Sequence, residues 1–124
     1  MILSIERRDL DPGIVVLELS GRIVLGNDAK TVEWKVDELL KENRKRVIFD
    51  LSRVTILDST GVGIMVMCFA RVKKAGGALR IAGANGSVEQ ALRMTNVDRL
   101  ISLDPTVAAA AEILSSEKQT GSPS

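Results

Sequence analysis

Residues 58–63, with the sequence Asp-Ser-Thr-Gly-Val-Gly, place one carboxylate and two hydroxyls at the start of an apolar segment. The run that follows, residues 64–70, carries no charge and is typical of a mostly buried helix. Asp58 or Ser59 is expected to cap that helix, because a side-chain oxygen there can accept hydrogen bonds from free backbone N–H groups. A phosphate on Ser59 would lie where these donors and the helix dipole favour negative charge. The motif therefore indicates a phosphorylation switch at Ser59, with Thr60 as the alternative acceptor.

The amino-acid composition argues against a catalytic site. The chain has no histidine, and Cys68 is its only cysteine. Ser-His and Cys-His nucleophile pairs and histidine-based metal sites are therefore excluded, and nothing in the local sequence would activate Asp58 or Ser59. We expect no enzyme activity, no metal and no cofactor. Cys68 lies inside the apolar segment and is interpreted as a reduced core side chain.

Charge and hydropathy exclude two further classes of partner. The 17 basic and 16 acidic residues nearly balance, and aromatic residues make up only 2% of the chain, so neither electrostatics nor base stacking indicates a nucleic-acid partner. The longest apolar stretches are shorter than the roughly 20 residues of a membrane-spanning helix. Charged residues within positions 1–10 argue against a signal peptide. We expect a cytoplasmic protein with no nucleic-acid partner and no membrane association.

Strand and helix signals alternate along the chain after an initial hairpin, whose turn lies at residues 11–13. This order predicts an α/β fold in a single domain, with a mixed, mostly parallel sheet of four to five strands and about four helices packed on it. The domain is expected to span residues 1–114, and the polar residues 115–124 are expected to form a disordered tail. A loop is predicted at residues 52–57. The predicted strands are 2–6, 14–19, 46–51, 79–82 and 100–103. The first predicted helix begins at Asn27 or Asp28 and ends near residue 43, and the second begins at Asp58 or Ser59 and ends near residue 74. The third begins at Ser87 and ends near residue 94, and the fourth begins at Pro105 and ends near residue 114.

The helix after Ser59 has two unlike sides. Its core face is predicted to hold Val62, Met65, Val66, Phe69 and Val72. The other side carries Ile64 and Met67 between polar ends, and exposed apolar area beside a serine suits a docking surface, unless neighbouring elements cover it. Gly61 and Gly63 lower helix propensity by up to about 1 kcal/mol each relative to alanine. That cost indicates either close backbone packing or free access to Ser59.

The preceding helix carries an apolar stripe at helical spacing, and this stripe defines its buried face. The residues of the stripe are Ala29, Val32, Val36, Leu39 and Leu40. Trp34 falls on the opposite side, where its indole either lies flat on the surface or contacts a partner. The sequence leaves both interpretations open.

The central motif and its flanks resemble the STAS domain of bacterial anti-sigma factor antagonists. The resemblance covers residues 2–114 and rests mainly on the motif between a Val-Ile-Phe-Asp strand and an apolar helix. Weaker support comes from residues 19–23, 77–83 and 95–100. The chain departs from the family in having Val62 where leucine is frequent between the two glycines. It also has a basic and apolar loop at residues 21–26, where an acidic or small polar residue is common.

The resemblance implies an anti-sigma factor antagonist that acts by partner switching in a stress response. The unphosphorylated form would bind an anti-sigma factor with serine kinase activity and so release a sigma factor. The kinase would then phosphorylate Ser59 and the complex would dissociate, and a serine phosphatase would restore the first state. The expected partner-binding residues are Arg22, Asn27, Asp58, Ser59, Thr60, Gly61, Gly63, Ile64 and Met67.

Two alternatives remain open at this level. A STAS domain can serve as a scaffold subunit of a large stress-sensing complex, whereas an antagonist is expected to be a monomer or a weak dimer. The helix start near Ser59 could instead bind a nucleotide or a lipid. The size of the species in solution tests the first alternative, and calorimetry with nucleotides tests the second.

Overall fold

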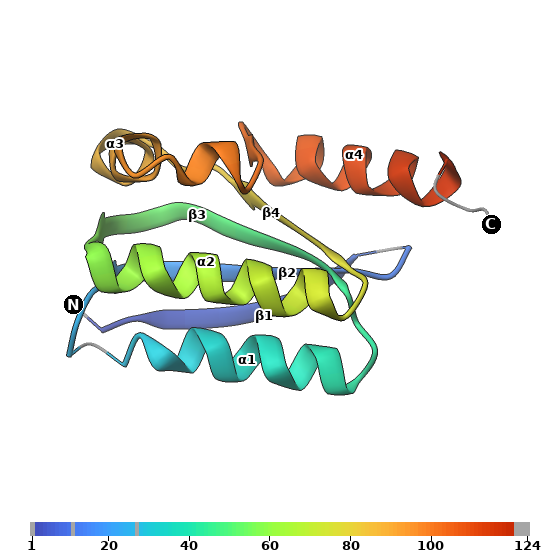
Figure 1. Cartoon of the computed structure of the whole chain (residues 1–124), viewed down its shortest axis with the longest axis horizontal. Helices are drawn as coiled ribbons and strands as arrows, with labels where there is room; N and C mark the ends of the chain where they lie inside the picture. The colour runs from blue at the N-terminus through green and yellow to red at the C-terminus, as the bar shows by residue number, and fades with distance from the viewer. Residues whose placement is uncertain (1, 11, 27, 121–124) are drawn as a thin grey trace.

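The structure is a computed structural model that describes residues 2–10, 12–26 and 28–120. A sheet of five strands lies between helices on its two sides (Figure 1). The elements in chain order are β1 (Ser4–Leu10), β2 (Ile14–Ile23), α1 (Lys30–Lys41), β3 (Arg46–Leu57), α2 (Ser59–Lys74), β4 (Ala78–Ala82), α3 (Gly86–Met94), the 3-10 helix η1 (Val97–Arg99), β5 (Leu103–Asp104) and α4 (Val107–Thr120).

The strands follow one another across the sheet in the order in which they occur in the chain, β1-β2-β3-β4-β5. The first two form the predicted antiparallel hairpin, and every later neighbouring pair is parallel. Parallel neighbours need crossover connections, and helices supply three of them. The predicted α/β domain with a mixed, mostly parallel sheet is confirmed.

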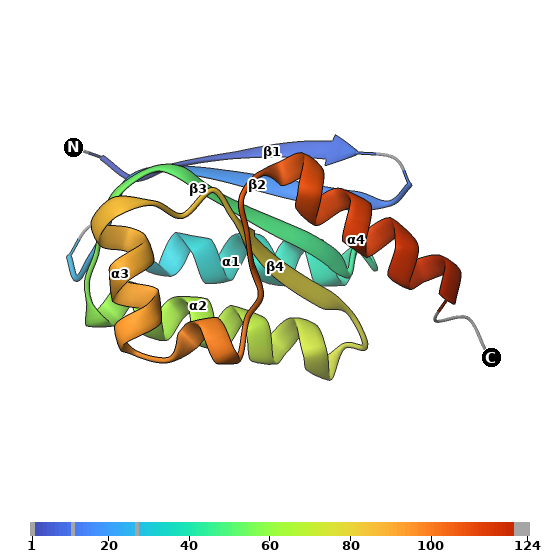
Figure 2. The same cartoon turned by 90° about the horizontal axis from the view of Figure 1, so that it is seen from above.

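The two faces of the sheet are covered unequally. Helices α1 and α2 lie side by side on one face, and α4 lies on the other (Figures 1 and 2). The larger apolar cluster joins α1 and α2 to the sheet around Leu17, Phe49 and Ile81, all of which are fully buried. The smaller cluster seats Ala110 and Leu114 of α4 on the opposite face. The core is aliphatic, as the composition requires, and it holds α2 in a fixed place.

Strands β2 and β3 run further than the sequence predicted, to Ile23 and Leu57. The sequence predicts a loop at residues 52–57, because polar side chains interrupt the apolar run. These residues extend the strand instead, and two register shifts against β2 bring Val54 and Leu57 to the core although they are three residues apart. The extension carries the chain to the point where α2 begins.

Two predicted helix caps are wrong. Helix α1 begins at Lys30, after Ala29, which offers no side-chain cap, and Asp28 lies before it with φ of 55°. Asn27, the other predicted cap, lies outside the described residues. The hydroxyl of Ser87 lies within α3 rather than before it, and it donates a hydrogen bond to the Thr55 carbonyl 3.2 Å away. Ser87 thus uses, in a contact with β3, the polar group that local rules assign to a cap.

The ends of the chain also differ from the predicted boundaries. Strand β1 extends to Leu10, since its charged residues pair with β2 along an exposed edge. The last strand is Leu103–Asp104, because the chain is still turning after η1: the N–H groups of Leu100 and Ile101 both donate to the Val97 carbonyl. Helix α4 continues to Thr120, beyond the predicted end at Leu114. Residues 121–124 of the predicted tail lie outside the described residues.

Candidate functional site

The first turn of α2 is fixed by one carboxylate. Oδ1 of Asp58 accepts a hydrogen bond from the Gly61 N–H at 3.0 Å, which makes Asp58 the N-cap. Its Oδ2 accepts from the Leu25 N–H at 3.1 Å, in the connection between β2 and α1. Asp58 therefore links two segments that are far apart in the sequence and holds the β2–α1 connection beside the start of α2.

The protonation of Asp58 follows from these contacts. Partial burial raises the pKa of Asp58, but the backbone N–H groups of Gly61 and Leu25 stabilise the carboxylate, and the net pKa lies below the ordinary value. Both oxygens of this carboxylate accept hydrogen bonds from the backbone, so its role is structural. It is not a free base that could activate the neighbouring serine.

Ser59 is the first residue of α2 and its side chain is exposed, whereas Thr60 is half-buried. Of the two caps that the sequence allowed, the structure uses Asp58. The Ser59 hydroxyl is thus left on the surface, at the positive end of a helix of 16 residues. It is therefore accessible from solvent.

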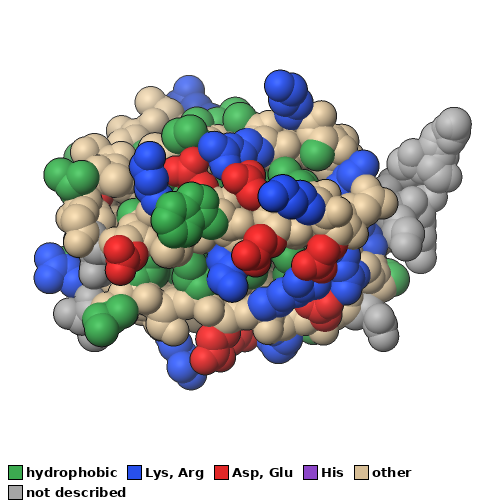
Figure 3. All heavy atoms as spheres, turned by 90° about the horizontal axis from the view of Figure 1, so that it is seen from below, with side chains coloured by type: hydrophobic (Ala, Val, Ile, Leu, Met, Phe, Trp, Pro, Cys, Tyr) green, Lys and Arg blue, Asp and Glu red, His purple; other side chains and the backbone are tan. Residues whose placement is uncertain are grey.

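An apolar groove of about 510 Å³ opens directly beside Ser59. One wall is the β2–α1 connection with the first turns of α1, including Leu25 and Trp34, and the other is α2. The α2 residues that line it are Ser59, Thr60, Gly63, Ile64 and Met67. The face shown in Figure 3 carries its larger hydrophobic patches toward one end, while charged side chains are spread over both ends.

The buried side of α2 is rotated from the predicted one. Ile64 was expected on the exposed side but is only 5% exposed, because α1 packs alongside α2 and covers it. Val66 and Phe69, expected in the core, are half-buried, while Cys68 is fully buried as predicted. Met67 is 48% exposed, in agreement with its predicted position. Ile64 therefore forms part of the groove wall without being a freely exposed side chain.

Trp34 and Leu25 complete the groove. Trp34 is 61% exposed, so its position opposite the apolar stripe of α1 is confirmed, and it faces the groove rather than an isolated surface. Leu25 is 78% exposed and was not singled out from the sequence. The sequence signal that could have identified Leu25 is its place in a short loop beside a glycine, where no neighbouring residue would bury it.

Arg22, a predicted partner-binding residue, does not line the groove. Arg22 is exposed near the end of β2 and lies in register with Ile56. Since the next residue, Ile23, is fully buried below α1 and α2, Arg22 leaves the sheet on the opposite face. Asn27 lies outside the described residues.

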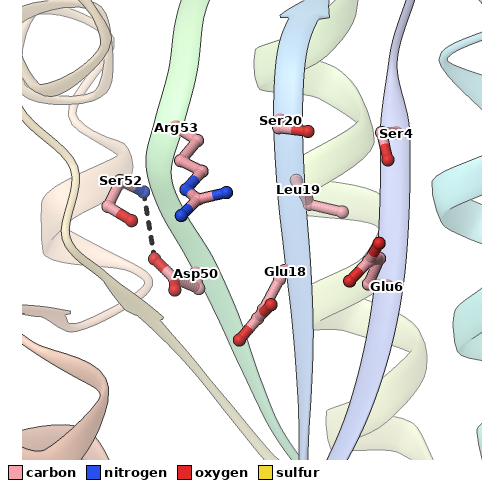
Figure 4. A pocket seen from close by; sticks show the side chains of 8 residues that line it. All are labelled: Ser4, Glu6, Glu18, Leu19, Ser20, Asp50, Ser52 and Arg53. Atoms are coloured by element: carbon pink, nitrogen blue, oxygen red, sulfur yellow. Dashed lines mark hydrogen bonds between the residues drawn. The ribbon is translucent and has the colours of Figure 1, made fainter.

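A second hollow lies on the sheet face opposite α1 and α2 and is polar (Figure 4). Glu6, Glu18 and Asp50 stand in register across three neighbouring strands. Glu18 accepts from the Arg8 guanidinium at 2.9 Å, and Asp50 accepts from a backbone N–H. Glu6 is exposed, so the three carboxylates are interpreted as a solvated sheet surface. Within the described residues, no group of three or more potential ligands is placed to hold a metal.

The helices of the described part of the chain include none long and apolar enough to cross a membrane. A family model of the STAS domain matches residues 8–110. The chain belongs to the STAS family. The resemblance seen in the sequence is thereby confirmed.

Known relatives share both sequence and structure with this STAS domain. It is 28% identical over 99 residues to a Thermotoga neapolitana protein provisionally named an anti-sigma factor antagonist, which covers 80% of this chain and 88% of that protein. A crystal structure from Thermotoga maritima, named in the same way, has a TM-score of 0.80 at 26% identity over 89% of this chain and 93% of that one. The Bacillus cell-fate determinant SpoIIAA in its phosphorylated form shares the fold, with a TM-score of 0.68 at 16% identity over 88% and 97% of the two chains.

Proposed function

We propose that this STAS domain is an anti-sigma factor antagonist whose binding is controlled by phosphorylation of Ser59. The unmodified form binds an anti-sigma factor that has serine kinase activity, which releases a sigma factor. Phosphorylation of Ser59 ends the complex, and a serine phosphatase resets the protein. The Thermotoga relatives, named as antagonists, and the phosphorylated state of SpoIIAA support this proposal.

The observation that carries the proposal is the exposed Ser59 hydroxyl at the rim of an apolar groove. A phosphate there would be a dianion inside a contact surface, and it must be paired or desolvated when a partner binds. The cost could reach several kcal/mol, and a loss of about 4 kcal/mol weakens an association roughly a thousandfold. One modification can therefore end binding while the domain stays folded.

The same geometry disfavours catalysis by the chain itself. The carboxylate next to Ser59 is occupied by the N–H groups of Gly61 and Leu25, and the sequence holds no histidine. Ser59 is thus proposed as a substrate of another enzyme and not as a nucleophile.

The test uses the chain with purified anti-sigma factors of the organism that encodes it. Incubation with ATP should phosphorylate the wild type and Thr60→Ala once, and should leave Ser59→Ala unmodified, as read by mass spectrometry. In binding assays Ser59→Ala should bind like the unmodified wild type, and Ser59→Asp should bind more weakly. Equal affinities of these two variants would exclude a switch at Ser59. A large assembly in sedimentation experiments would favour a scaffold role instead.

A further inference from the structure

The two glycines of the α2 motif have unlike surroundings. A Cβ atom on Gly61 would overlap the Ile23 carbonyl oxygen and approach Leu57 Cδ1 to 2.5 Å. A Cβ atom on Gly63 would meet nothing within 4 Å, and Gly63 does not have the positive φ that favours glycine. The fold therefore requires glycine at position 61 but not at position 63.

Glycine is the least favourable residue in a helix interior after proline. Gly63 is the fifth residue of α2 and is exposed, so an alanine would fit and would stabilise the helix. Nothing in the packing of the residues that the structure describes accounts for this cost. A missing side chain does offer one thing that alanine cannot, which is close approach of another molecule to the helix backbone.

Gly63 also lies on the stripe of α2 that borders the groove. Ser59, Gly63 and Met67 are spaced by four residues, so they share one helix face, and neighbours in this series are about 6 Å apart along the axis. All three line the groove. A molecule seated there that approaches Gly63 closely lies within one helical turn of the Ser59 hydroxyl.

We propose that Gly63 is the point at which the anti-sigma factor comes closest to α2, with apolar side chains of that partner filling the groove. The inference rests on the proposed function and identifies its docking contact. The groove volume of about 510 Å³ holds several large side chains, and Trp34 and Met67 present exposed apolar surface on its two walls. The occupant is taken to be the anti-sigma factor because the groove is continuous with the hydroxyl that this kinase must reach.

The test compares Gly63→Ala with a matched pair at Glu112, an exposed position of α4 on the other side of the sheet. Gly63→Ala should raise the melting temperature by roughly 4 °C and weaken binding of the purified anti-sigma factor at least tenfold. At the control position, the melting temperature of Glu112→Ala should be higher than that of Glu112→Gly by a similar amount. Both control variants should bind the anti-sigma factor like the wild type. A change that stabilises the fold yet weakens binding cannot be attributed to unfolding.

Each other result overturns the inference in a recognisable way. If Gly63→Ala binds as tightly as the wild type while Ser59→Asp does not, the docking contact is wrong and the proposed function stands. If the wild type sediments as a dimer that Gly63→Ala dissociates, the groove belongs to a second copy of the chain. If no anti-sigma factor of the organism binds the unmodified wild type, the proposed function fails as well.

Discussion

Removing the Asp58 carboxylate should destabilise the domain by about 2 to 3 kcal/mol. Asp58→Ala deletes the cap of α2, a change that typically costs about 1 kcal/mol. It also deletes the hydrogen bond from the Leu25 N–H, and a hydrogen bond to a charged group contributes about 1.5 to 3 kcal/mol. Because the site is half-buried, we take the lower part of that range.

Urea denaturation of the wild type, Asp58→Ala and Asp58→Asn measures this loss. Asparagine is as good a cap as aspartate, but the Gly61 and Leu25 N–H groups meet different oxygens of Asp58, and asparagine has an NH2 group in place of one of them. Asp58→Asn should therefore keep the cap, lose the bond from Leu25 and cost about 1.5 kcal/mol. If Asp58→Ala were as stable as the wild type, the hydrogen bonds that link the β2–α1 connection to α2 through Asp58 would contribute nothing to the free energy of unfolding.

The same variant predicts a pH dependence. The pKa of Asp58 is lowered on folding, so its carboxylate contributes stability that is present above the ordinary value of 3.8 and is lost as the pH falls through the lower pKa of the folded state. The stability difference between the wild type and Asp58→Ala should be constant near neutral pH and should shrink below about pH 4. A difference that grows on acidification would contradict the assigned donors.

Three further outcomes follow from the packing. Gly61→Ala should destabilise by about 3 kcal/mol or more in urea denaturation, because its Cβ has no room; a neutral effect would show that α2 can move away. Asp104→Ala should cost about 3 kcal/mol by the same assay, because it removes a two-bond ion pair with the largely buried Arg80, the shorter bond spanning 2.7 Å, while the exposed control Asp9→Ala should cost clearly less. Burial raises the pKa of Cys68 to about 12, so iodoacetamide at pH 8 should label it only as the protein unfolds; rapid labelling of the native domain would refute its burial.

Local features of the site could be predicted from the sequence. A helix start at Asp58 and Ser59 follows from capping rules that involve only neighbouring residues, and the structure bears it out. Whether Ile64 is covered could not be predicted, because that depends on how closely α1 packs beside α2. The bond from Leu25 to Asp58 joins residues 33 positions apart and leaves no periodic signal.

The same distinction holds for the fold. Alternation of strands and helices predicted the sheet, because each parallel crossover needs a helix. The length of β3 escaped prediction because Val54 and Leu57 are buried at a spacing of three residues, which strand alternation does not predict and which the register shifts against β2 allow. Gly61 and Gly63 look alike in the sequence, and only the position of the Ile23 carbonyl tells them apart.

The central claim is that charge on Ser59 decides whether a partner stays bound. Titration calorimetry of one purified anti-sigma factor with the unmodified chain, and with the same chain fully phosphorylated on Ser59, measures it most directly. The account predicts binding that weakens about a thousandfold on phosphorylation, with an unchanged melting temperature of the free domain. Equal affinity of the two forms would contradict it.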